Sequence, residues 1–290
     1  MKNVSHGNTF GKSQIYFKVN EIPKSITCQV QPREGLEVYT VFSIFCSSGK
    51  QDLYYEYSYQ TSTSSKKTLY KGFDIQYYFH LPAGEPSDGY RVTIFSQITN
   101  PLGSKTHLCP VTVTVLPSFM RNKSITDLPE LELFSSGTRN LSALLFIGNH
   151  IEIRNYVILL TNILNRLYTE EIKMAFELQS KIRNVLIFTV CSLPFQDQEE
   201  IVDIVSLLLD LLRISKQVTA NSAVVIINSA KAIFDEYFEP GQILLQRELV
   251  EYVVLLITQA LEVSFKHSET QNSILDGLEI ISNFMLVRLL

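Results

Sequence analysis

The chain has 290 residues, of which 46% are apolar and 19% are charged, and its formal net charge is −4. That length suits about two domains of ordinary size, and the composition excludes bulk disorder. The charge is unevenly spread, because residues 1–125 hold 13 Lys and Arg against 8 Asp and Glu, whereas the remainder holds 12 against 21. Opposite charges favour packing of the two halves against each other. The basic half has no clustered stripe of Lys and Arg, so nucleic-acid binding is not expected.

We expect no targeting or membrane signal within the given residues. Residues 1–6 lack the apolar segment of a signal peptide. The most apolar stretches, such as residues 185–195, are shorter than the roughly 20 residues that a membrane helix needs. We therefore predict no signal peptide and no membrane span within this chain. Residues 283–290 stop inside an apolar helical pattern, which suggests a fragment of a larger protein.

Composition changes sharply near residue 120. Leu occurs 7 times in residues 1–125 and 29 times afterwards, whereas Gly and Pro together fall from 15 to 7. Turn residues with Tyr, Thr and Val are typical of β-structure, and Leu-rich, Gly-poor sequence is typical of helices. The sequence therefore predicts a multidomain protein, with an all-β domain followed by an all-α domain.

The first half reads as a β-sandwich over residues 21–119, after an extended lead-in or the end of a preceding module over 1–20. Short alternating apolar runs recur between turn signals, at 26–30, 38–46, 54–59, 92–98 and 111–115. About seven short strands at this spacing, with no helix between them, predict an antiparallel sandwich of fibronectin type III or immunoglobulin shape.

The second half reads as a helical domain over residues 127–290, which we expect to be truncated at its C-terminus, after a linker over 120–126. Asp197-x-x-Glu200 is a capping box that predicts a helix start just before Ile201. In that helix the polar residues form one narrow stripe, at Asp203, Ser206, Asp210 and Arg213. Nearly every other position is Leu, Ile or Val, so the helix is expected to be largely buried.

No motif in the chain carries recognisable catalytic chemistry. There is no His-Glu-x-x-His, no Gly-x-Ser-x-Gly, no phosphate-binding loop and no Cys-x-x-Cys. The five His are scattered without metal-ligand spacing. We therefore predict no enzyme activity, no catalytic residues, no metal and no cofactor.

The cysteines and the glycosylation sequons bear on the cellular compartment. Cys28, Cys46 and Cys109 lie on apolar faces of predicted strands, and Cys191 lies in an apolar helix, so all four are candidates for reduced core residues. The Asn-x-Ser/Thr sequons are at Asn3, Asn122 and Asn140. About two sequons are expected by chance in a chain of this composition, so they are weak evidence for glycosylation. Asn122 is the best acceptor, because a linker should be exposed.

The β half also carries an ordered series of motifs. In chain order these are Cys28-x-Val30-x-Pro32-x-x-Gly35, Thr40-x-Phe42-x-Ile44-x-Cys46, Leu81-Pro82-x-Gly84, Asn100-x-x-Gly103 and Val111-x-Val113-x-Val115. This series resembles the end of the receptor-for-egg-jelly (REJ) module in the ectodomains of polycystin-type receptors. The resemblance covers residues from about 25 to 118. The rest of the chain, from about 126 to 290, looks like the helical region that precedes the self-cleavage strand of such receptors.

The resemblance implies a disulfide between Cys28 and Cys46, but simple register speaks against it. In a hairpin that turned at residues 32–35, Cys28 would lie four residues before the turn and Cys46 eleven after it. The mismatch, at roughly 3.3 Å per residue, is beyond disulfide reach. Cys109 is the geometric alternative partner of Cys46. We expect one disulfide that involves Cys46, with its partner open.

The sequence leaves two hypotheses of function. The resemblance implies a non-catalytic ectodomain segment of a polycystin-like membrane receptor, on the extracellular face, acting in adhesion, ligand sensing or force transmission. Its partners would be adjacent modules of the same receptor and a protein or glycan ligand, and calcium-channel-linked signalling would belong to the parent family. The alternative is an intracellular scaffold whose β-domain and helical solenoid bind protein partners.

Overall fold

The computed structural model of the chain describes residues 15–16, 20, 22–23, 26–47, 52–62, 64, 66–117, 133–168, 173–195, 197–237, 247–265, 275, 277–279 and 281–282. Strands occupy the span from Thr27 to Leu116, and helices follow from Leu133 onward. The predicted order of a β region before a helical region is therefore confirmed. The predicted linker over 120–126 and most of the lead-in over 1–20 lie outside the described residues.

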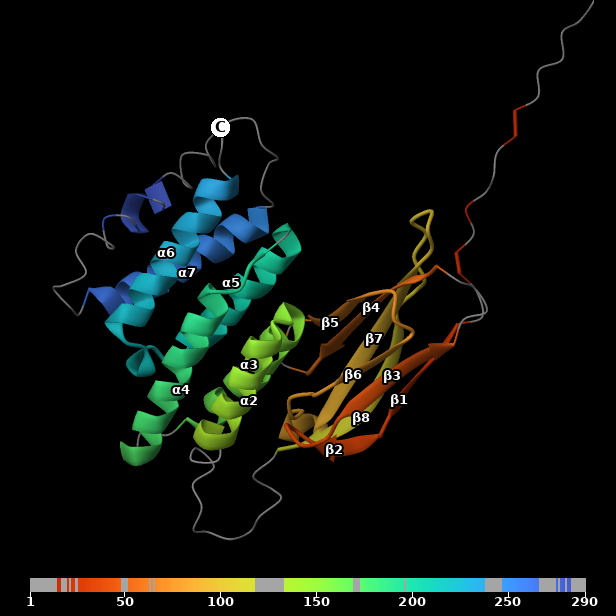
Figure 1. Cartoon of the computed structure of the whole chain (residues 1–290), viewed down its shortest axis with the longest axis horizontal. Coiled ribbons are helices and arrows are strands. Elements are labelled where there is room, and N and C mark those ends of the chain that lie inside the picture. The colour runs from red at the N-terminus through yellow and green to blue at the C-terminus, as the bar shows by residue number, and fades with distance from the viewer. Residues whose placement is uncertain are drawn as a thin grey trace, which may run out of the picture.

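The strands form two sheets (Figure 1). A five-stranded sheet has the order β2-β8-β7-β4-β5, with β2 at Glu34–Leu36, β4 at Tyr54–Gln60, β5 at Lys67–Gly72, β7 at Arg91–Thr99 and β8 at Cys109–Leu116. A three-stranded sheet has the order β1-β3-β6, with β1 at Thr27–Gln31, β3 at Phe42–Ser47 and β6 at Gln76–Phe79. All pairings are antiparallel except β2 with β8, which is parallel.

The alternation predicted from sequence sets which face of each strand is buried. In β3 the side chains of Phe42, Ile44 and Cys46 are buried, while those between them are more exposed. Strands β7 and β8 alternate in the same way, and so does β4 except at Ser58, which is also buried. The buried apolar residues of these strands are Tyr55, Tyr57, Tyr59, Val92, Ile94, Ile98, Val111, Val113 and Val115. Because side chains point to opposite faces with a period of two, one face of each sheet contributes to the core.

An aromatic stack joins the two sheets across that core. The Tyr70 ring, in β5, lies 5.8 Å from the Tyr57 ring of β4 and 4.6 Å from the Tyr77 ring of β6, measured between ring centroids. Tyr77 in turn stacks on Phe79 with the centroids 6.2 Å apart. Burial raises the pKa of Tyr77 to about 12. Such offset aromatic pairs stabilise a core beyond their buried area, by about 0.5–1.5 kcal/mol each.

Within the described residues, six α-helices of ten residues or more come after the sheets and a π-helical turn at Leu133–Gly137, and residues 275, 277–279 and 281–282 are helical as well. The six helices are α2 at Thr138–Ile147, α3 at His150–Leu167, α4 at Lys173–Cys191, α5 at Gln198–Leu212, α6 at Ala220–Tyr237 and α7 at Arg247–Ser264. The predicted cap of α5 is confirmed, because the Asp197 side chain accepts a hydrogen bond from the Glu200 backbone N–H at 2.8 Å. The Asn149 side chain caps α3 in the same way.

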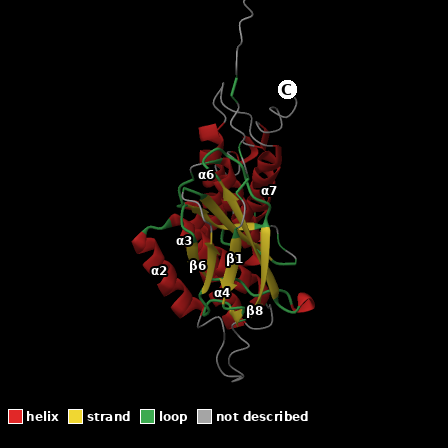
Figure 2. Ribbon diagram, turned by 90° about the vertical axis from the view of Figure 1, so that its right-hand side faces the viewer, coloured by secondary structure: helices red, strands yellow, loops and turns green. Residues whose placement is uncertain are grey.

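The helices lie beside the sheets and pack closely on them. In Figure 1, α3 and α5 are the helices nearest to β5, while α6 and α7 lie farther away. Figure 2 looks from the side of the sheets and shows the helices behind the strands. The buried apolar side chains of both regions form one contiguous cluster. The two regions therefore share a core rather than being joined only through a linker.

Candidate functional site: the interface between the sheets and the helices

Strand β5, at the edge of its sheet, contacts helices α3 and α5. An edge strand leaves backbone groups unpaired, and the Asn155 side chain of α3 donates a hydrogen bond to the Leu69 carbonyl of β5 at 2.8 Å. On either side of Leu69, Lys67 and Lys71 form ion pairs with α5, to Asp210 at 2.8 Å and to Glu199. The interface thus covers a strand edge and joins basic β residues to acidic helical residues.

The polar stripe that the sequence places on α5 faces this interface. Asp210 meets Lys67, and Asp203 meets Arg154 of α3 with 3.3 Å between Oδ2 and Nη1. Burial raises the pKa of Asp203, and the positive Arg154 partly offsets that rise. Burial also raises the pKa of the nearby Tyr59, and the charges of Asp210 and Asp203 raise it further. The stripe therefore contacts the β region and α3.

A buried ion pair holds the other end of the interface. Glu37 follows β2 and is fully buried, and its carboxylate forms an ion pair with the Arg166 guanidinium in the last turn of α3. The same carboxylate oxygen accepts a hydrogen bond from the Ala83 backbone N–H at 3.1 Å. A buried charge is costly unless it is paired and hydrogen-bonded. Arg166 therefore compensates a β-domain charge that water cannot reach.

A cleft of about 360 Å³ separates these two ends of the interface. Its walls come from both regions, with Tyr59, Lys67 and Pro82 on the β side and Arg166 and Arg213 on the helical side. The Asn165 side chain in this wall donates to the Asp210 carbonyl at 3.0 Å and so links α3 to α5. The cleft is polar, and within its wall Lys67 and Asp210 form an ion pair with each other.

A buried polar cluster fixes the helices relative to one another. Arg183 of α4 is fully buried, and its guanidinium donates to the Gln217 side chain at 2.9 Å and to the Leu211 carbonyl at 3.0 Å. Burial lowers the pKa of Arg183 to about 10. Gln217 donates to Gln179, which donates to the Leu167 carbonyl at the end of α3. The cluster therefore satisfies carbonyls at the C-terminal ends of α3 and α5, where a positive charge is favourable.

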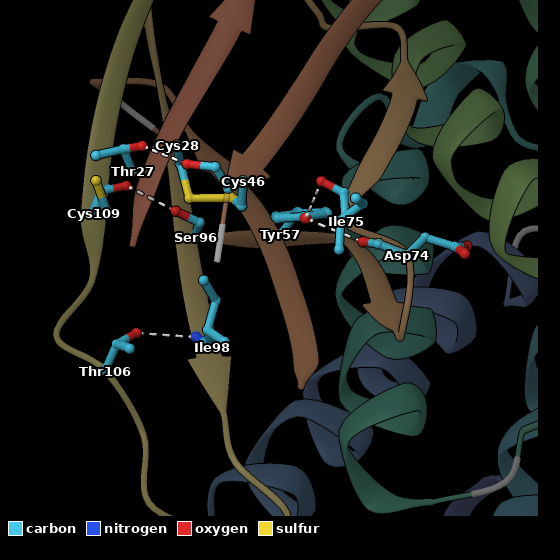
Figure 3. The surroundings of a disulfide bond; sticks show 11 residues. Thr27, Cys28, Cys46, Tyr57, Asp74, Ile75, Ser96, Ile98, Thr106 and Cys109 are labelled. Atoms are coloured by element: carbon cyan, nitrogen blue, oxygen red, sulfur yellow. Dashed lines mark hydrogen bonds between the residues drawn. A yellow bond between two sulfur atoms is a disulfide. The ribbon is translucent and has the colours of Figure 1, made fainter. Parts of the chain in front are cut away.

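Cys28 and Cys46 are joined by a disulfide, with their Cα atoms 4.1 Å apart (Figure 3). They are directly opposite each other in the antiparallel pairing of β1 with β3. The geometric objection to this pair was wrong, because the chain does not turn back as a hairpin at residues 32–35. Residues Glu34–Leu36 instead leave the sheet as β2 and pair with β8 in the other sheet. The connection from Gln31 to Phe42 is therefore long enough for Cys28 and Cys46 to lie opposite each other despite their unequal distances from residues 32–35.

The other two cysteines are free. Cys109, the predicted alternative partner of Cys46, begins β8 and is half-buried, and its carbonyl accepts from the Ser96 hydroxyl at 3.4 Å (Figure 3). Cys191 ends α4, and burial raises the pKa of its thiol to about 12. A thiol with so high a pKa holds almost no thiolate at neutral pH, so Cys191 is a core residue rather than a reactive one.

Of the three sequons, the structure places only Asn140, which is exposed in the first turn of α2. Asn3 and Asn122 lie outside the described residues. Asn140 lines a second cavity, of about 420 Å³, between β6 and helices α2 and α3. Glycosylation at any of the three positions stays a prediction.

Neither a metal cluster nor a membrane helix occurs in the part of the chain that the structure describes. Within those ranges, no group of three or more His, Cys, Asp or Glu side chains is placed to hold a metal ion. Among the described helices, none has both the length and the apolar character for crossing a membrane.

Sequence reasoning missed the two side chains that matter most at the interface. Glu37 appears as a polar residue after a turn, and Arg166 as a cation near a helix end. Their sequence separation is 129 residues, so no local pattern connects them. The α5 stripe was predicted, but its pairing with Lys67, like the pairing of Glu199 with Lys71, could have been suggested only by the charge asymmetry between the two halves.

Comparisons with known proteins agree with the resemblance seen in the motifs and extend it. The family model of the REJ domain matches residues 2–159. The chain is similar to Polycystin-1-like protein 1 from three species. The Homo sapiens protein is 40% identical over 97% of the chain, the Mus musculus protein 38% over 95%, and the Oryzias latipes protein 41% over 91%. The chain spans about 10% of the length of each of these relatives. The REJ family match covers more of the chain than the motifs did at about 25–118, because it begins at residue 2 and continues through α2 into α3.

A solved structure, a β-1,2-glucanase from Parabacteroides distasonis, aligns with 82% of this chain and 41% of its own. Its sequence identity is 9% and its TM-score is 0.25, so it supports no statement about fold or function.

Proposed function

Because the chain belongs to the REJ domain family, we propose that it is a non-catalytic ectodomain segment of a polycystin-like membrane receptor, on the extracellular face, that mechanically couples neighbouring modules. Adhesion, ligand sensing or force transmission would be the task of the whole receptor, and channel-linked signalling would belong to the parent protein. The adjacent modules of the same receptor would be the first partners.

The observation that carries the proposal is the shared core with its charged interface. A flexible linker would transmit little force between two independent domains. Here the apolar cores are contiguous, and ion pairs from Glu37, Lys67 and Lys71 join the β region to α3 and α5. A load applied at one end of such a unit reaches the other end through packed side chains.

The architecture and the disulfide support the extracellular setting. We propose that residues 21–119 are a sandwich of fibronectin type III or immunoglobulin type, and that residues 127–290 form the helical domain beyond a linker over 120–126. The Cys28–Cys46 disulfide suits an oxidising compartment, whereas disulfides are rare in cytosolic proteins. This favours the receptor segment over an intracellular scaffold.

The compartment is tested on protein secreted from animal cells behind a supplied leader. Intact mass with thiol alkylation, with and without reductant, should count one disulfide and two free thiols. Peptide mapping should assign the disulfide to Cys28 and Cys46, and a Cys109→Ser variant should keep it. Four free thiols would contradict the extracellular reading.

The coupling is tested by pulling on single molecules from the two ends of the secreted chain. A shared core predicts that the β region and the helices unfold together in one main event at low pulling speed. Arg166→Met should lower the unfolding force and separate the event into two. Two independent events already present in the unaltered protein would contradict the coupling while leaving the compartment result intact.

A further inference from the structure

The cavity between β6 and helices α2 and α3 has features that the interface does not explain. It measures about 420 Å³, which is within the range of small-ligand sites of roughly 300–1,000 Å³. Aromatic rings line it from both sides, with Tyr77 and Tyr78 from β6 and Tyr156 from α3. Tyr78 is 61% exposed, so it is the most accessible of these tyrosines.

Two polar atoms in this wall are poorly satisfied. The Tyr156 hydroxyl and the Asn155 carbonyl oxygen Oδ1 are buried and make no hydrogen bond of standard geometry within the described part of the chain. Tyr156 is 9% exposed, and Asn140 is the side chain that lies nearest to its hydroxyl among those that lower its pKa. Buried polar atoms in native proteins nearly always have a partner, so the Tyr156 hydroxyl would gain from an acceptor and the Asn155 oxygen from a donor.

Asn140 lies at the rim of this cavity and begins the sequon Asn140-Leu141-Ser142. It is exposed, in the first turn of α2, and its side chain hydrogen-bonds the Tyr156 hydroxyl closely enough to offset part of the rise that burial causes in the pKa of Tyr156. The N-linked sugar nearest to a protein is an N-acetylglucosamine, whose ring carries C–H groups on its faces and an acetamido group. We propose that Asn140 is glycosylated and that this first sugar docks in the cavity.

The attachment is the ordinary transfer from a lipid-diphosphate-linked oligosaccharide. The Asn140 side-chain nitrogen forms a bond to the anomeric carbon, the bond from that carbon to phosphate oxygen breaks, the amide loses one proton, and the lipid diphosphate leaves. The step happens in the secretory pathway, so the inference rests on the proposed extracellular setting.

The cavity's chemistry matches that sugar better than it matches an apolar segment of another module. Aromatic faces suit the C–H groups of the sugar ring, and the acetamido group brings an acceptor near the Tyr156 hydroxyl and a donor near Asn155. An apolar segment would leave both polar atoms unsatisfied, which costs stability. Covalent attachment at the rim also gives the sugar a high effective concentration, so weak contacts are enough to hold it.

The test uses the full chain secreted from animal cells, with Ser5→Ala and Ser124→Ala removing the other two sequons. The glycan is trimmed enzymatically to one N-acetylglucosamine, and site occupancy is measured by peptide mass spectrometry. Ser142→Ala removes the sequon and leaves Asn140 in place, while Ser142→Thr keeps the sequon as a matched control. Thermal unfolding is then compared among these proteins.

We expect occupancy at Asn140 and a melting temperature about 2 °C or more higher with the sugar than without it, the shift that a modest contact gives in a protein of this size. Tyr78→Ser, at an exposed position, should abolish that difference. An unmodified Asn140, an equal melting temperature with and without the sugar, or a difference that persists in Tyr78→Ser would overturn the proposal. Glycan at Asn122 in unaltered protein, with Asn140 empty, would overturn it while leaving the extracellular setting in place.

Discussion

The two ends of the interface use the same chemistry with very different burial. At one end the Glu37 carboxylate is fully buried beneath Arg166. At the other end Lys71 pairs with Glu199, whose side chain is 72% exposed. Water and salt screen the exposed pair, whereas the buried carboxylate has no such alternative. The comparison teaches that the number of ion pairs across an interface says little about which of them hold it together.

The largest loss of unfolding free energy is expected from Arg166→Met, which removes the Arg166 guanidinium from the buried Glu37 carboxylate. Breaking one partner out of a buried ion pair typically costs about 3–5 kcal/mol of unfolding free energy, and the lower part of that range applies because Arg166 is itself partly exposed. Chemical denaturation at neutral pH measures it. The double variant Glu37→Gln with Arg166→Met should recover most of the loss. A double variant as unstable as the single one would show that the effect comes from packing of the Arg166 stem.

An intermediate loss of unfolding free energy is expected from Lys67→Ala. Lys67 is mostly buried and its partner Asp210 is partly exposed, so the pair lies between the two extremes. A loss of about 1 kcal/mol is expected, near the upper end for partly exposed pairs. A double-mutant cycle with Asp210→Ala isolates the interaction energy. A coupling as large as that of Glu37 with Arg166 would break the proposed dependence on burial.

The smallest loss of unfolding free energy is expected from Lys71→Ala, because Glu199, the partner of Lys71, is largely in solvent. The change in unfolding free energy should be about 0.5 kcal/mol or less, and it should shrink further when the salt concentration is raised. Melting curves at low and high salt measure this. Lys67→Ala serves as the control, since its loss should depend less on salt. A large loss for Lys71→Ala that is insensitive to salt would reverse the comparison.

Local patterns in the sequence predicted the elements well. The change in composition near residue 120 separated strands from helices, and period-two alternation identified buried positions such as Phe42 and Ile44. The cap at Asp197 was also predictable, because it depends on a side chain and a backbone N–H three residues apart. Contacts of this kind are encoded within a few residues.

The disulfide shows where such reasoning fails. Counting residues from an assumed hairpin turn argued against a disulfide between Cys28 and Cys46. The count would be correct if the chain formed a hairpin there. Whether a hairpin forms at all depends on residues 34–36, which pair with β8 residues 80 positions further along the chain. The path of the chain between the two cysteines is thus decided by the second sheet.

The sequence by itself determined the two regions, their strand and helix character, the polar stripe on α5 and the membership of a family of receptor modules. Only the tertiary structure decided that Cys28 bonds Cys46, that the α5 stripe faces β5, and that Glu37 meets Arg166. The physical reason is the range of the interactions. Periodicity and capping act over a few neighbouring residues, whereas burial and charge pairing depend on which distant segments share a core.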